Sequence, residues 1–196
     1  MNESTARPLR FLTLQVVGAV AVVHLVAGGM ELARLSNAGL LGSYLTGAVF
    51  AQPEALLFTV SGLAILLGVV ATGAGYLDHR RAYLLGVLAM VVFVVGWLAW
   101  HTVFDHGLAL GESGATEGHG HDHDDHSHDG LSDVVVSHYV EPLVFLFTGV
   151  SQPGQVALAA VSKTLELVAL ALLTGLLWAD PAVRHTRDEG NPSHGH

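Results

Sequence analysis

Four apolar blocks, at residues 9–35, 53–77, 82–104 and 153–178, set the strongest limit on how this chain folds. About 20 apolar residues are enough for a helix to cross a bilayer, at about 1.5 Å per residue. The 196-residue chain is 51% hydrophobic and only 13% charged, which is too apolar for an ordinary soluble domain. We therefore predict an all-α integral membrane protein built as a four-transmembrane-helix bundle.

The arginines predict which way the four helices cross. Six of the seven arginines fall before or at the start of the first block, between the second and third, or after the fourth, and only Arg34 falls on the other side. By the positive-inside rule, both polar tails, 1–8 and 179–196, are cytoplasmic. Residues 105–133 are then an extracellular loop, and 36–52 and 131–149 are expected at the outer face. The six residues are Arg7, Arg10, Arg80, Arg81, Arg184 and Arg187.

The first block has a second interpretation, a cleaved signal peptide, because arginines precede its apolar core. Residues 11–23 already fill a normal h-region, yet the apolar pattern continues beyond them without a clear A-x-A site. We therefore interpret residues 9–35 as a retained transmembrane helix.

A short internal repeat suggests how the bundle is organised. Residues 44–53 resemble residues 146–153, and Val60-Ser61 matches Val161-Ser162. We predict two tandem units of helix, outer segment and helix with the same orientation, as in parallel-repeat membrane proteins. The first unit and the third helix occupy 9–104, and the rest of the second copy occupies 134–178, after the histidine-rich insertion. Chance similarity between apolar stretches is the alternative.

The segment from His119 to Asp129 carries five histidines interleaved with four aspartates. Imidazole and carboxylate groups hold borderline divalent cations such as zinc, nickel and cobalt. The chain has no cysteine, so thiolate ligands and disulfides are excluded. Two alternatives are a solvated acidic loop and a pH sensor, because free imidazoles gain charge near pH 6.5. The candidate ligands are His119, His121, His123, His126 and His128.

A second set of candidate metal ligands lies where the loop meets the helices. His101 and Asp105 are four residues apart and share a helix face, and His106 follows them. His138 and Glu141 share a face if their segment is helical. With Glu31 near the outer end of the first helix, these residues are expected to form a more ordered nitrogen-and-oxygen site. Ordinary interfacial polar residues are the alternative.

Two features resemble known metal carriers. The histidine-rich segment resembles the loops of zinc and nickel carriers, and His101-Thr102-Val103-Phe104-Asp105 resembles one HxxxD ligand pair of the cation-diffusion type. The second intramembrane pair of those carriers is not found here, and their loops are generally cytoplasmic. The resemblance implies metal handling without assigning the chain to that family.

A third polar group lies deeper in the predicted helices. Lys163 and Glu166 are one turn apart midway along the fourth helix, and His24 lies midway along the first. Ionisable residues at the bilayer centre cost about 2.5 to 3.5 kcal/mol each on insertion scales, so they are rare and mark function by default. With Glu31 they are predicted to form a buried polar relay, or a structural ion pair beside a packed histidine.

The sequence thus predicts a multi-pass cell-membrane protein that binds a divalent transition metal at its outer face. Metal capture, transport or service as an accessory subunit all fit, with lipid and a homo-oligomer or other membrane subunits as partners. The chain has no phosphate loop, nucleophile elbow, HExxH motif or dinucleotide fingerprint, so we expect no enzyme. It has no basic patch for nucleic acid. One lysine among many acidic residues indicates a halophile-like composition.

Two other functions stay open. One is a non-metal membrane organiser whose loop is merely solvated. The other is a small redox subunit holding haem or quinone, although His24 and His101 differ in depth by roughly 10 Å at helical rise.

Overall fold

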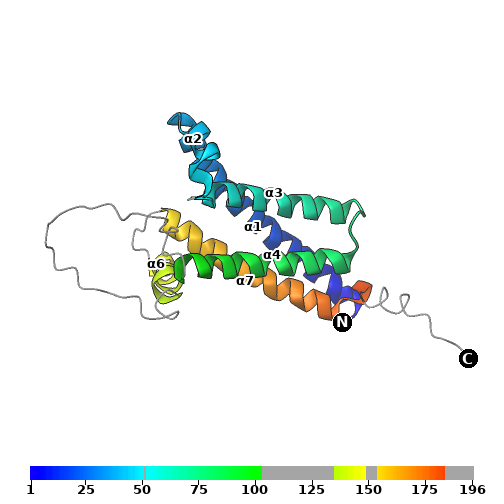
Figure 1. Ribbon diagram of the computed structural model, residues 1–196. Helices are drawn as coiled ribbons and strands as arrows, with labels where there is room; N and C mark the ends of the chain where they lie inside the picture. The colour runs from blue at the N-terminus through cyan, green and yellow to red at the C-terminus, as the bar shows by residue number, and fades with distance from the viewer. Residues whose placement is uncertain (51, 103–134, 149–153, 184–196) are drawn as a thin grey trace, which may run out of the picture. The chain divides into compact units, whose positions relative to one another are not determined.

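The computed structural model describes residues 1–50, 52–102, 135–148 and 154–183, which form helices joined by short turns, with no strand among them (Figure 1). They divide into two compact units, Met1–Val94 with Ser162–His196, and Val95–Val161. The elements in chain order are α1 (Glu3–Asn37), α2 (Leu41–Thr46), the 3₁₀ turn η1 (Ala48–Phe50), α3 (Glu54–Gly73), α4 (His79–Thr102), the π-helical segment η2 (Val136–Val140), α6 (Glu141–Thr148) and α7 (Gly154–Ala179).

Among the described residues, four helices are long and apolar enough to cross a membrane: α1, α3, α4 and α7. Their bounds differ from the apolar blocks because capping and turn residues, rather than hydropathy, end a helix. Helix α1 already begins at Glu3, since the Asn2 side chain accepts a hydrogen bond from the Thr5 amide at 3.1 Å. Helix α3 ends at Gly73, and Gly75 turns the chain at a φ of 79°.

Helices α1 and α3 pack closely against each other, as Figure 1 shows. A Cβ atom placed on Gly28 of α1 would lie 2.6 Å from the amide nitrogen of Thr59 and 2.7 Å from the carbonyl oxygen of Ala55. One placed on Gly62 of α3 would lie 2.9 Å from the carbonyl oxygen of Ala21. The missing side chains therefore let the two backbones approach, as small residues do between membrane helices.

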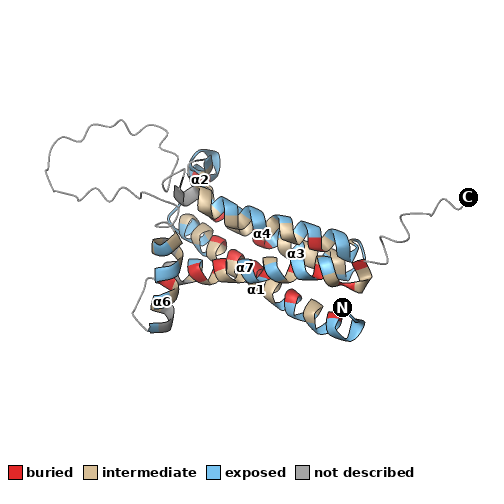
Figure 2. Ribbon diagram, turned by 90° about the horizontal axis from the view of Figure 1, so that it is seen from below, coloured by how far each residue is buried: buried red, intermediate tan, exposed pale blue. Residues whose placement is uncertain are grey.

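The core of the first unit is built from residues of α1, α4 and α7, which Figure 2 colours red where they are buried. Val20, Met90 and Leu176 are almost completely buried. Leu67 of α3 and Leu88 of α4 are instead mostly exposed. A large exposed apolar surface on long helices is typical of a membrane-facing surface.

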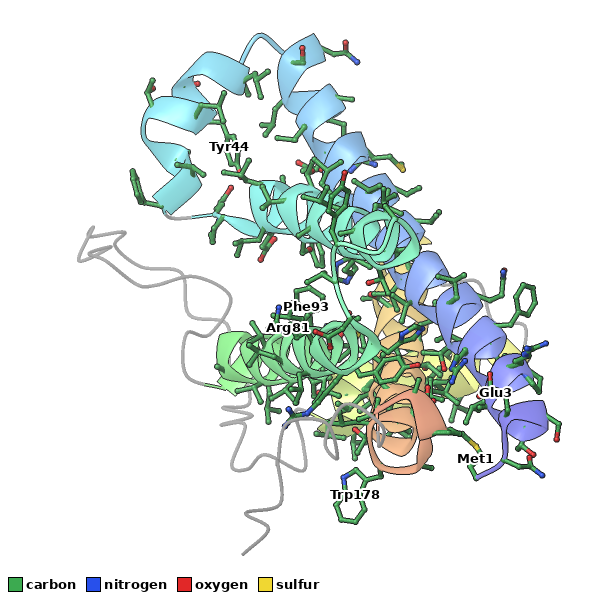
Figure 3. All side chains as sticks on the ribbon, turned by 90° about the vertical axis from the view of Figure 1, so that its right-hand side faces the viewer. Met1, Glu3, Tyr44, Arg81, Phe93 and Trp178 are labelled. Atoms are coloured by element: carbon green, nitrogen blue, oxygen red, sulfur yellow. The ribbon has the colours of Figure 1, made fainter. Side chains whose placement is uncertain are left out.

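The segment between α1 and α3 is also helical and is held to α3 by Tyr44, labelled in Figure 3. The buried Tyr44 hydroxyl donates to the Gln52 carbonyl at 3.0 Å and accepts from the Leu56 amide at 3.4 Å. The other expected outer segment contains η2 and α6. Neither of these short stretches is long enough to be a candidate span.

Candidate functional site: a polar cluster among the apolar helices

The polar cluster, which we define as His24, Ser61, Ser162, Lys163 and Glu166, lies within the first unit. Its centre is the imidazole of His24 on α1, which is almost completely buried. His24 Nδ1 lies 2.9 Å from the hydroxyl oxygen of Ser61 on α3. His24 Nε2 lies 3.0 Å from Oε1 of Glu166 on α7. Both ring nitrogens therefore have a partner, each on a different helix.

The carboxylate of Glu166 collects donors from its own helix as well. Ser162 donates to Oε1 at 2.9 Å, and the Lys163 ammonium donates to Oε2. Lys163 Nζ also lies 3.4 Å from the carbonyl oxygen of Phe93 on α4. Among the described residues, no buried side-chain nitrogen or oxygen is left without a hydrogen-bond partner. The desolvation cost of these charged groups is thus offset by a complete set of contacts.

Two aromatic rings flank the imidazole. The Phe58 ring on α3 stands edge-on to His24 with the centroids 5.2 Å apart, and the Phe93 ring on α4 is tilted at 4.8 Å. Phe93 can be located in Figure 3. Helices α1, α3, α4 and α7 therefore all contribute to the surroundings of His24.

A second polar network joins the N-terminal parts of α1 and α4 to Asp180, the residue that follows α7. Arg10 Nε donates to Oδ2 of Asp180 at 2.8 Å, and the Tyr83 hydroxyl donates to the same oxygen at 2.7 Å. Burial alone raises the pKa of the Asp180 carboxyl, but the hydrogen bonds from Arg10, Tyr83 and the Ala182 amide outweigh it and hold the pKa at about 2. We call this part of the first unit the Asp180 end.

The structure brings together only three of the four residues predicted to form the deep polar group. It brings His24, Lys163 and Glu166 together, but Glu31 lies apart from them: its half-exposed side chain pairs with Arg34 at 3.1 Å on the same helix. The sequence-based relay therefore contained one residue that is not part of the cluster. Glu31 lies seven residues beyond His24 on α1, about 10.5 Å further along the helix axis, and this separates it from the cluster.

Most of the predicted metal ligands fall outside the described residues. Asp105, His106 and the histidines of 119–128 do so, and so do the side chains of His101 in α4 and His138 in η2. Glu141 begins α6 and is exposed. The described part of the chain holds no group of three or more His, Asp or Glu side chains arranged to bind a metal ion. The sequence-based metal sites thus stay predictions.

Sequence reasoning missed both serines of the cluster and the whole Asp180 network. Ser61 and Ser162 occupy matching positions in the predicted repeat, and both contact the His24–Glu166 pair, so the repeat itself was a usable signal. Asp180 and Arg10 are charged residues at the margins of apolar blocks, which gave a weaker signal. Nothing local in the sequence pointed to Tyr83.

The fold and the cluster together define a class: an all-helical protein with four helices long and apolar enough to span a membrane, and a fully hydrogen-bonded ionic group among them. Comparison of the chain with protein-family models, with curated proteins and with solved structures finds no match.

Proposed function

We propose that this chain is a multi-pass membrane protein that binds divalent transition-metal ions, zinc, nickel or cobalt, on the outer side of the membrane. It serves metal capture or uptake, either as a homo-oligomer or as an accessory subunit of a larger carrier. The observation that carries this proposal is the run of five histidines and four aspartates between His119 and Asp129.

The arrangement of the helices supports the proposed location of the histidine-rich run on the outer side of the membrane. Arg10, Tyr83 and Asp180 hold the start of α1, the start of α4 and the end of α7 at one end of the first unit. Helix α4 runs unbroken from His79 to Thr102, so the chain leaves it about 34 Å from where it entered. Arg80 and Arg81 lie at the start of α4, and the histidine-rich run follows the end of α4 in sequence, so the positive-inside rule assigns the run to the outer side.

The proposed ligand chemistry follows from the residue types. Five imidazoles with neighbouring carboxylates supply several overlapping nitrogen-and-oxygen ligand sets, so binding is multivalent and of moderate affinity, because ordering the segment opposes it. A more selective site is proposed where the segment meets the helices. Its ligands are His101, Asp105, His106, His138 and Glu141.

Isothermal calorimetry on the full-length protein with zinc and nickel tests the proposal. We expect saturable heat from the wild-type chain and its loss when residues 118–129 are deleted. Two matched variants separate the ligand types: one replaces the five histidines of this run with glutamine, and the other replaces its four aspartates with asparagine. The histidine variant should lose most of the affinity and the aspartate variant only part of it.

Uptake into sealed vesicles tests the further step from binding to transport. His101→Ala should reduce accumulation of zinc or nickel while the calorimetric signal of the histidine-rich run remains. If the wild-type protein gives no heat above a buffer blank with either metal, the proposed function is wrong.

A further inference from the structure

A half-open cavity of about 610 Å³ lies in the first unit between α1, α3, α4 and α7. Helices α3 and α4 are joined by a short turn, as Figure 1 shows, yet their backbones barely touch each other. Small residues of both helices, among them Gly68, Gly86 and Ala89, line the cavity. Such residues usually bring membrane helices together, but here they border a space whose volume falls within the range of ligand pockets.

The wall of this cavity is almost wholly apolar. The hydroxyl groups of Thr13 and Thr72 each donate to a carbonyl oxygen of their own helix at 2.8 Å. At the inner end, the Ser61 hydroxyl already meets His24 Nδ1 at 2.9 Å and the carbonyl oxygen of Phe58 at 3.0 Å. The wall therefore favours hydrocarbon over water, because cavities lined by apolar groups stay dry.

The dimensions of the cavity limit what it can hold. Its lining extends along α4 from His79 to Phe93, which is about 21 Å at helical rise. One leaflet of a bilayer, headgroups included, is about 20 to 22 Å thick. The mean cross-section is about 29 Å², whereas a helix about 10 Å across needs about 80 Å². The cavity is thus too narrow for a further helix and has the length of a single lipid chain.

The cavity opens to the membrane-facing surface of the unit. Leu14 of α1 and Leu85 of α4 both line it, yet they are 46% and 53% exposed. Exposed apolar side chains at the rim of an apolar cavity give a hydrocarbon chain a continuous path from the bilayer to the inner wall.

The outer end of the cavity, near the Asp180 end, carries cationic side chains. Arg10 and His79 line it, and the exposed Arg80 follows His79 at once. Arg10 is neutralised by Asp180 and Glu3, whereas Arg80 has no ion pair among the described residues. An arginine at the membrane surface attracts anionic lipid headgroups, and its guanidinium binds phosphate well.

We propose that this cavity binds one anionic phospholipid from the leaflet that faces the Asp180 end. One hydrocarbon chain of the lipid lies between α3 and α4, and its phosphate group lies beside His79 and Arg80. The lipid then connects two helices that barely touch each other directly. This site rests on the membrane location given under the proposed function, but it is independent of metal binding by the histidine-rich run.

Photochemical crosslinking of the full-length wild-type protein tests where the chain lies. The protein is purified in mild detergent, mixed with one equivalent of phosphatidylglycerol that carries a diazirine midway along one chain, irradiated, digested and mapped by mass spectrometry. We expect crosslinks at Gly68 and Ala89 of the cavity wall in preference to the exposed Leu67 and Leu88. Equal labelling of the two pairs would overturn the proposal.

Variants test the cavity by native mass spectrometry, which measures the phosphatidylglycerol retained by the full-length protein. Ala89→Phe places a ring in the cavity wall and should lower retention by about tenfold or more. Val92→Phe is the matched control, because it places the same ring at an exposed position of α4. Wild-type retention in Ala89→Phe would refute the cavity as the site.

Headgroup selection is tested with phosphatidylglycerol and phosphatidylcholine that carry identical chains. The wild-type protein should retain the anionic lipid preferentially, and Arg80→Gln should reduce this preference. Arg34→Gln is the matched control, since Arg34 is also exposed but lies about 36 Å from Arg10 along α1. Equal retention of the two lipids, or a neutral isoprenoid found in place of phospholipid, would contradict the proposed occupant.

Deletion of residues 118–129 separates this proposal from the proposed function. The deletion removes the candidate metal ligands of the histidine-rich run but leaves every residue that lines the cavity. We therefore expect the deleted protein to retain phosphatidylglycerol as the wild type does. Loss of lipid together with loss of metal binding would show that the lipid depends on the histidine-rich run and would overturn the cavity site.

Discussion

His24 on α1 and Glu166 on α7, which are 142 residues apart in the chain, lie 3.0 Å apart between Nε2 and Oε1. Both side chains are almost completely removed from solvent. This contact links the first and last membrane-length helices through two buried polar side chains. It fixes the rotation of both helices about their axes, since turning either one would strand a charged or polar group among apolar side chains.

Glu166→Ala should destabilise the protein by about 3 to 5 kcal/mol, because it leaves Lys163 buried and charged without its partner. The double variant Lys163→Met with Glu166→Met should recover much of this loss, since it removes both charges. Thermal unfolding in detergent measures the difference. Glu31→Ala is the control, as it breaks only a half-exposed pair with Arg34, worth about 0 to 1 kcal/mol. Equal losses in the two single variants would contradict the prediction.

Gly28→Ala should weaken the packing of α1 on α3, because the added Cβ would meet the backbone of Thr59 and Ala55, which cannot move away as a side chain can. We expect a loss of about 1 to 3 kcal/mol, the usual cost of overpacking. Gly29→Ala is the matched control on the same helix, since nothing lies within 4 Å of its Cβ position. That variant should gain up to about 1 kcal/mol in helix propensity. Chemical denaturation of the two variants side by side shows whether their effects have opposite signs.

The Asp180 end should make the protein acid-sensitive in a defined range. The carboxyl has a pKa of about 2 when folded, against an ordinary value of 3.8. Its stabilising contribution is therefore complete above about pH 4 and is lost as the pH falls through about 2, because the unfolded chain binds the proton first. Asp180→Asn should remove this part of the pH dependence, so the stability difference from wild type should shrink toward pH 2. Unfolding curves over this pH range provide the measurement, and a constant difference would count against it.

Tyr44→Phe should loosen the connection between α2 and α3 without unfolding the bundle. The variant keeps the ring but deprives the Gln52 carbonyl of its donor, at a cost of about 1 kcal/mol. Hydrogen–deuterium exchange should rise at the start of α3 and stay unchanged near Gly62. Exchange that rises equally at both places would mean that Tyr44 supports the whole helix pair instead.

The sequence predicted Lys163 and Glu166 as partners because residues three apart on a helix share a face whatever the rest of the fold does. It also placed His24 at nearly their depth, because depth follows from counting residues along a helix of fixed rise. The same count puts Glu31 about 10.5 Å from the level of His24, two turns further along α1. Only the structure shows that Glu31 pairs with Arg34 on its own helix.

The sequence by itself determined the helical class and the four membrane-length helices, since the length and hydropathy of a segment are local properties. The tertiary structure alone decided that Ser61 and Phe93 meet His24, that Tyr83 meets Asp180, and that Gly28 and Gly62 permit α1 to lie against α3. These contacts join residues on different helices, so they depend on rotation and on approach distance. Both are set by the sum of many small packing and hydrogen-bond terms, and no single stretch of sequence contains that sum.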